Sequence, residues 1–167
     1  EIGSGLVGSE MCIRDRRETG KQYIAYARAH DMPIIVACGR PYHIDPEINH
    51  GINDLITSFG FVLVTEDALS YLEGYAPRKV LNQWTFQSRM YNAARYVCTQ
   101  PDMQVVQLVS FGCGTDAITT DEVSAILARG QRLYTQLKID EITNLGAVNI
   151  RLRSLFAALE ERKEDHK

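Results

Sequence analysis

Four short runs rich in apolar residues recur along the chain. They lie at residues 34–38, 61–65, 105–111 and 133–139. The first run contains no polar residue, which is typical of a strand covered on both faces of a sheet. Each run has a length common among strands of globular proteins. The pattern therefore predicts four strands.

Between these runs, apolar residues recur at helical spacing. This periodicity predicts five helices, at residues 18–30, 52–59, 78–97, 121–128 and 150–163. Gly60 and Gly130 are expected to end the second and the fourth helix, and Thr120 to cap the fourth. Trp84 is expected on the inner face of the long third helix.

The alternation of strands and helices determines the expected fold. Strands that alternate with helices form parallel sheets, and their right-handed crossovers place helices on the faces of the sheet. The sequence therefore predicts an α/β fold, namely a flavodoxin-like or Rossmann-like parallel sheet of about four strands with helices on both faces.

The first 16 residues, EIGSGLVGSEMCIRDR, differ in character from the rest. They lack the positive start and the apolar core of a signal peptide and are too acidic for a transit peptide. Back-translated with permitted codons, residues 6–15 resemble a transposase-based sequencing adapter. We interpret residues 1–16 as adapter-derived, not native and disordered. A single α/β domain is expected over residues 17–160, followed by a charged tail over residues 161–167.

Composition excludes some classes of partner. The chain of 167 residues has a net charge of −3; without residues 1–16 it keeps 16 basic and 18 acidic residues, a net charge of −2. This balance argues against nucleic acid as a partner, because a basic footprint is expected there. No apolar run approaches the ~20 residues that span a bilayer, so no membrane partner is expected. The widely spaced Cys38, Cys98 and Cys113 favour a cytoplasmic protein with reduced thiols.

Four polar segments each follow the carboxyl end of a predicted strand, at residues 39–50, 65–70, 112–116 and 138–144. In open parallel sheets, ligands bind in the crevice beyond these ends. The segments are therefore expected to meet at one edge of the sheet. The candidate ligand-binding residues within them are Gly39, Arg40, His43, Glu66, Asp67, Gly112, Gly114, Asp140 and Glu141.

Purely structural interpretations of these segments also remain open. The loop at 39–50 would also suit a rigid turn with solvated charges. The acidic pairs 66–67 and 140–141 could orient Arg40, hold a cation or bind a polar ligand, but they are also ordinary helix caps. Cys113 lies between two glycines, at the end of a strand and just before a helix, and a thiolate is stabilised near a helix N-terminus. A nucleophile or an iron–sulfur ligand would use this position, and a tight turn with a buried cysteine is the alternative.

Long stretches of the sequence resemble one family. GRPYHIDPEINHGI, VTEDALS, NQWTFQSRMYNAARYV, VQLVSFGCGTDAITTDEVSAIL and LKIDEITNLGAVNIRLRSL occur in consistent order between residues 30 and 160. Together they look like the acyl-CoA dehydratase activase-related proteins. These are large bacterial proteins that resemble fusions of a 2-hydroxyacyl-CoA dehydratase activator with a dehydratase-like module.

The resemblance implies an iron–sulfur protein that transfers single electrons at low potential. Cys113 best matches a family cysteine, so the resemblance implies it as a cluster ligand, with the other ligands outside this chain. The glycine loops of the activator are absent, so ATP is expected only in a missing activator part. The chain is expected to be the C-terminal fragment of the dehydratase-like module and to be inactive alone.

The resemblance also implies partners: the remaining domains of the parent chain and an acyl-CoA dehydratase or activator component. Two other functions remain open. One is a non-catalytic α/β interaction or small-molecule-binding domain in which Cys113 carries no metal. The other is a flavodoxin-like nucleotide-binding domain, although no G-x-G-x-x-G sequence follows the first strand.

Overall fold

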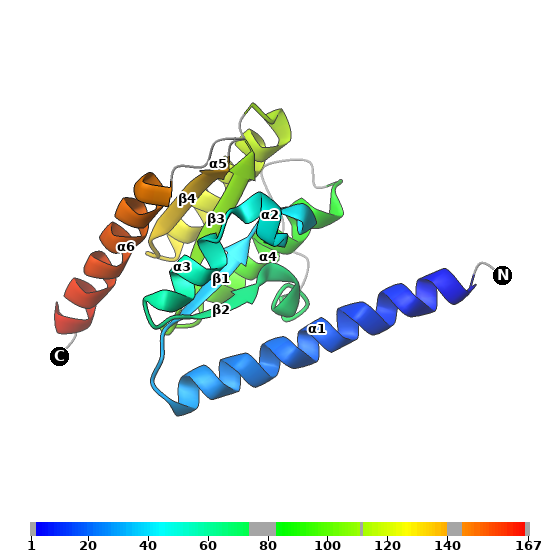
Figure 1. Cartoon of the computed structure of the whole chain (residues 1–167), viewed down its shortest axis with the longest axis horizontal. Helices are drawn as coiled ribbons and strands as arrows, with labels where there is room; N and C mark the ends of the chain where they lie inside the picture. Colours follow the sequence, from blue (N-terminus) through cyan, green and yellow to red (C-terminus); the bar gives the residue numbers. More distant parts are fainter. Residues whose placement is uncertain (1–2, 74–82, 111, 140–144, 166–167) are drawn as a thin grey trace.

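The four predicted strands form one parallel sheet with the order β2-β1-β3-β4. The computed structural model describes residues 3–73, 83–110, 112–139 and 145–165. The strands are β1 (Ile34–Cys38), β2 (Val62–Thr65), β3 (Met103–Ser110) and β4 (Tyr134–Ile139) (Figure 1). Strand β1 pairs with β2 and β3, and β3 pairs with β4, always in parallel. This is the strand order of a flavodoxin-like sheet, which confirms the predicted fold class.

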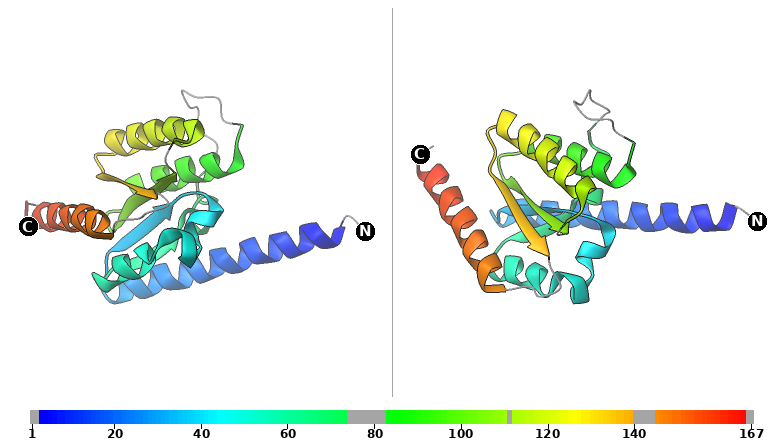
Figure 2. Two further views of the ribbon diagram at one scale, coloured as in Figure 1. Left: turned by 45° about the horizontal axis from the view of Figure 1, so that its top comes forward. Right: turned by 90° about the horizontal axis from the view of Figure 1, so that it is seen from above.

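Helices cover both faces of this sheet (Figure 2). They are α1 (Gly3–Ala29), α2 (Pro46–Asn49), α3 (Ile52–Ser58), α4 (Thr85–Cys98), α5 (Gly114–Arg129) and α6 (Leu145–Asp165), with 3₁₀ turns η1 (Pro41–Ile44) and η2 (Glu66–Ala68). Helices α1, α4 and α5 contribute to the apolar core on one face, and α3 and α6 to the core on the other. Among the described residues, no helix is long and apolar enough to cross a membrane.

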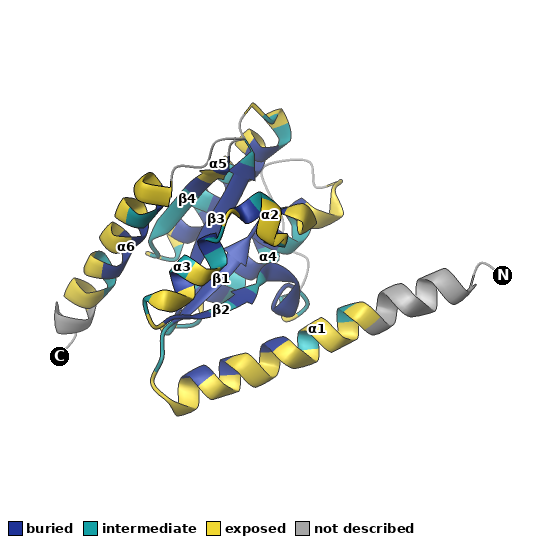
Figure 3. Cartoon of the chain, in the orientation of Figure 1, coloured by how far each residue is buried: buried dark blue, intermediate teal, exposed yellow. Residues whose placement is uncertain are grey.

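The central strands are buried because both of their faces contact a core (Figure 3). In β1, Ile34 and Val36 lie in the first core, and Ile35 lies in the second. All five residues of β1 are buried. A strand whose side chains alternate between two apolar cores needs apolar residues at every position, which explains the unbroken run IIVAC.

Helix α5 begins seven residues before the predicted start at residue 121. Cys113 is its N-cap residue, and Gly114 is its first helical residue. The hydroxyl groups of Thr119 and Thr120 donate hydrogen bonds to carbonyl groups four residues earlier, so these β-branched residues continue the helix. The predicted capping role of Thr120 is therefore wrong, whereas Gly130 ends the helix as expected.

Helix α1 is also longer than predicted. It runs from Gly3 to Ala29, which differs from the disorder predicted for residues 1–16. No proline interrupts the segment, and extending a formed helix costs less than nucleating one. The N-terminal half of α1 projects away from the rest of the chain (Figure 1). The adapter origin of residues 1–16 stays a prediction.

Two other helix boundaries differ from the sequence prediction. Helix α4 begins at Thr85, and Trp84 is the N-cap residue of this helix. Because 41% of the surface of Trp84 is exposed, the prediction that Trp84 lies on the inner face of the helix is wrong. Residues 78–82 of this predicted helix lie outside the described residues. Helix α6 begins at Leu145 and extends through residues 161–165 of the predicted tail.

Candidate functional site at the β1–β3 switch point

A cluster of polar side chains lies beyond the carboxyl ends of β1 and β3. Arg40 follows β1, whereas Cys113 and Asp116 follow β3. The Arg40 Nη2 atom donates to the Cys113 sulfur at 2.6 Å, and its Nε atom donates to Asp116 Oδ1 at 3.0 Å. The chain leaves β1 toward β2 and leaves β3 toward β4, so this is the point at which the strand order reverses. Ligands of open α/β sheets bind at such a point.

Asp116 joins the two loops of the cluster. Its Oδ1 atom also lies 2.9 Å from Arg40 Nη2, so the carboxylate contacts the guanidinium group through two nitrogens. Its Oδ2 atom accepts a hydrogen bond from the amide of Ser110 at 3.0 Å. The side chain is buried, with 6% of its surface exposed. A buried carboxylate with this many partners fixes Arg40 beside Cys113.

His43 is a buried member of the cluster. It is 1% exposed, and its Nδ1 atom accepts a hydrogen bond from the Arg40 amide at 3.1 Å. The proton therefore resides on Nε2, which donates to Ser110 Oγ at 3.1 Å. Burial lowers the pKa of His43 and favours this neutral form. Gly39 permits the arrangement, since a Cβ atom there would lie 2.8 Å from Nδ1.

The surroundings of Cys113 favour the thiolate. The amide of Asp116 is the largest cause that lowers the pKa of Cys113, and the amide of Thr115 and the guanidinium of Arg40 add to it. The sulfur makes no full capping hydrogen bond, so the amides act mainly through their partial charges at the helix N-terminus. The structure thus supplies the electropositive position that a reactive or ligating cysteine requires.

Cys113 is therefore expected to be alkylated faster than Cys38 and Cys98. Burial raises the pKa of both Cys38 and Cys98, whereas that of Cys113 is lowered. Since each pKa unit changes the thiolate fraction about tenfold, iodoacetamide should modify Cys113 at least roughly ten times faster at pH 7.5. The rate should fall as the pH is lowered through its pKa. Peptide mapping by mass spectrometry measures each site. Equal rates at Cys113 and Cys98 would contradict the assignment.

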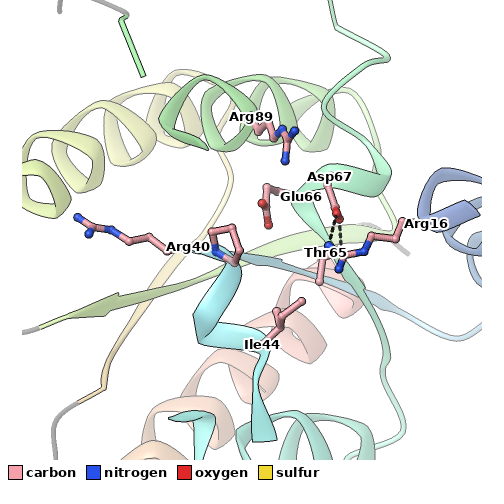
Figure 4. Close-up of a pocket in the computed structure, with 8 residues that line it drawn as sticks. Arg16, Arg40, Ile44, Thr65, Glu66, Asp67 and Arg89 are labelled. Atoms are coloured by element: carbon pink, nitrogen blue, oxygen red, sulfur yellow. Dashed lines mark hydrogen bonds and ion pairs between the residues drawn. The ribbon is translucent and has the colours of Figure 1, made fainter. Parts of the chain in front are cut away.

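An acidic pair lies at the neighbouring strand end, after β2. The side chain of Asp67 accepts hydrogen bonds from Arg16, at 3.2 Å, and from Thr65. Glu66 is 7% exposed, and its burial, followed by the charge of Asp67, raises its pKa to about 8. Figure 4 shows the pocket that these residues line, into which the Glu66 carboxyl group points.

The structure brings together only part of the predicted site. Arg40, His43 and Cys113 form the switch-point cluster, and Arg40 also lines the pocket beside Glu66 and Asp67. Gly112 occupies a turn with φ of +72°. A Cβ atom added at Gly114 would have no neighbour within 4 Å. Asp140 and Glu141 lie outside the described residues.

Sequence reasoning missed Asp116 and Ser110. Asp116 lies within the GCGTD segment that the sequence singled out, but the segment was expected to be a loop. Once Cys113 is known to be an N-cap residue, Asp116 occupies the first helical turn, where a carboxylate is favoured. A helix start at the glycine would have placed Asp116 one turn after Cys113. No comparable signal marks Ser110, which ends β3.

The donor set at this cluster does not complete an iron–sulfur site. Among the described residues, no group of three or more His, Cys, Asp or Glu side chains is placed to hold a metal. Cys38 is buried in the first core, and Cys98 packs against Gly130 at the end of α5. Cys113 fits one ligand position, and the described residues do not fit the rest of a cluster.

The fold and this cluster define a flavodoxin-like α/β domain with a polar site at its switch point. A family model described as "CoA enzyme activase uncharacterised domain" matches residues 4–69, which is less than half of the chain. The match supports a relation to activase-related proteins. It includes Arg40, His43 and Glu66, ends before Cys113, and begins inside residues 1–16. No curated protein and no solved structure gave a significant match.

Proposed function

We propose that the chain is a domain of an activase-related iron–sulfur redox protein, related to 2-hydroxyacyl-CoA dehydratases and their ATP-dependent activators. In this proposal Cys113 supplies one thiolate ligand, and the remaining ligands lie outside the described residues. The observation that carries it is the Cys113 sulfur at the N-terminus of α5, 2.6 Å from Arg40 Nη2, with a lowered pKa. The family match supports the activase relation.

The residues around Cys113 have defined roles in this proposal. The amides of Asp116 and Thr115 lower the pKa of Cys113, the guanidinium of Arg40 adds to this effect, and the Asp116 carboxylate positions Arg40. A thiolate held ready in this way can accept a metal without first losing a proton to solvent. The neutral His43 adds no positive charge, and it holds the loop after β1 in place through Arg40 and Ser110.

Cys113→Ser is expected to lower the bound iron and sulfide. The protein is expressed anaerobically from its gene, together with the coding sequence that adjoins this chain, and iron and sulfide are measured after purification. The substitution should leave α5 intact, because serine is a preferred N-cap residue. Cys98→Ser is the matched control and should not change either content. Equal iron in the parent and Cys113→Ser, or iron in neither, would overturn the ligand assignment.

A second candidate function is a small-molecule-binding or interaction domain with Cys113 unmetallated. The close contact between Arg40 and the sulfur favours it, because the guanidinium occupies one side of the thiol. In the experiment above, a parent protein without iron supports this candidate.

A further inference from the structure

A small open pocket lies between η2, α4 and the loop after β1, separate from Cys113. Its empty volume, part of which is open to solvent, is about 260 Å³. Thr65, Glu66, Asp67 and Arg89 line it, together with Arg16 and residues of the loop after β1. The Arg40 side chain points away from Glu66, toward Cys113 and Asp116 (Figure 4). The pocket therefore adjoins the switch-point cluster and shares Arg40 with it, but Cys113 and Asp116 do not line it.

Glu66 is the unusual residue of this pocket. Its side chain is more than nine-tenths buried, yet no described residue other than its own backbone amide forms a hydrogen bond with its carboxyl group. Asp67, by contrast, is bound by Arg16 and Thr65. Buried polar groups in folded proteins nearly always have partners. A carboxyl group in this position, with no other hydrogen-bond partner among the described residues, is open to a ligand that enters the pocket.

Arg89 provides the complementary charge. It extends from α4 toward Glu66 in Figure 4, and no carboxylate of the described residues lies within ion-pair distance of its guanidinium group. Its recorded contact is with the ring of Phe86, at 5.5 Å from the ring centroid. A guanidinium group without a carboxylate partner favours an anion with two oxygens in one plane.

We propose that this pocket binds a small carboxylate, with the guanidinium of Arg89 and the carboxyl group of Glu66 as its hydrogen-bond donors. A carboxylate accepts from both donors at once, and its single negative charge is repelled less by the nearby Asp67 than a phosphate dianion would be. The proposal does not depend on a metal at Cys113, since neither of the two proposed donors, Arg89 and Glu66, is among the groups that act on Cys113.

The charges around Glu66 give the proposal a pH dependence. Asp67 lies beside it on η2, Arg89 faces it from α4 and Arg16 from α1, Arg40 lines the pocket, and Cys38 lies behind it on β1. Below pH 8 Glu66 is mostly protonated and can donate a hydrogen bond to an anion. Above pH 8 it is charged and repels the anion. Affinity should therefore be full at pH 6.5 and fall as the pH rises through the pKa.

The test is a titration of the whole chain with sodium acetate, followed by ¹⁵N–¹H NMR at pH 6.5 and pH 9, with sodium chloride at equal ionic strength as the reference. The amide signals of residues 65–68 should shift to saturation at pH 6.5. With Glu66 titrating at about 8, the affinity should be about tenfold lower at pH 9. Inorganic phosphate and methylammonium chloride are titrated in parallel to test the charge and shape of the ligand.

Two substitutions separate the roles of the donors. Glu66→Gln keeps a donor that does not titrate, so acetate should bind equally at the two pH values. Arg89→Met should weaken binding at least about tenfold at both, since it removes the charged partner. Glu160→Gln and Arg153→Met, both on the exposed surface of α6, are the matched controls and should bind acetate like the parent.

Four results would overturn the proposal. Shifts that follow ionic strength alone exclude a site, and tighter binding of phosphate or methylammonium excludes a carboxylate. Equal pH dependence in the parent and Glu66→Gln excludes Glu66 as a donor. If a variant does not fold, the pH dependence of the parent decides the proposal, because affinity unchanged between pH 6.5 and pH 9 contradicts it.

Discussion

Asp116→Ala is expected to lower the free energy of unfolding by about 2–3 kcal/mol. The substitution removes both contacts to Arg40 and the acceptor of the Ser110 amide, while the Arg40 side chain remains only 26% exposed. A largely buried cation without its partner accounts for most of the cost. The value lies below that of a fully buried pair because part of the guanidinium group can still reach solvent.

The measurement is urea denaturation followed by circular dichroism, with a double-mutant cycle. Arg40→Met/Asp116→Ala should be destabilised less than the sum of the single variants, because it leaves no unpaired charge. Asp121→Ala, an exposed carboxylate on the same helix, is the control and should change stability by less than about 0.5 kcal/mol. Additive single effects would show that the ion pair contributes nothing to the fold.

Phe156→Ala is expected to destabilise the chain by about 3–5 kcal/mol. The ring of Phe156 stacks on Phe61 at a centroid distance of 4.1 Å and meets the edge of Phe59 at 4.6 Å. Phe156 is 9% exposed and belongs to the core that joins α6 to α3 and the sheet. Removing the ring leaves a cavity and also removes the aromatic contacts.

The control for this prediction is Ile150→Ala on the same helix. Ile150 is 68% exposed, so its loss should change the free energy of unfolding by less than about 0.5 kcal/mol. Both variants are compared by urea denaturation, with α6 helicity followed by circular dichroism. Equal stability of Phe156→Ala and Ile150→Ala would show that α6 is not anchored through the aromatic cluster.

The sheet could be predicted from the sequence because its signal is local. The strands are short segments rich in apolar residues, and burial on both faces leaves little choice of residue in β1. The parallel arrangement follows from the alternation with helices. Helix boundaries were less certain: Cys113 as an N-cap residue and the continuation of α1 depend on a balance of weak propensities that sequence patterns resolve poorly.

The candidate site was likewise predicted from the sequence only in part. The fold pattern placed Arg40 and Cys113 after strands, and parallel strands bring such residues to one edge. The selection of Asp116 as their common partner required the helix to begin at Gly114. Asp67 is bound by Arg16 and Thr65, whereas no other described side chain forms a hydrogen bond with Glu66; this difference depends in part on a contact between segments distant in the sequence.

The sequence by itself determined the order and type of the main elements, the parallel sheet and the strand ends that carry the polar residues. These properties follow from hydrophobic periodicity, which acts over a few residues. Only the tertiary structure decided that Arg40 turns toward Cys113 and that Glu66 faces an open pocket. Arg40 and Cys113 are 73 positions apart in the sequence, and Glu66 and Arg89 are 23 positions apart. The packing of the chain sets the distances between these side chains.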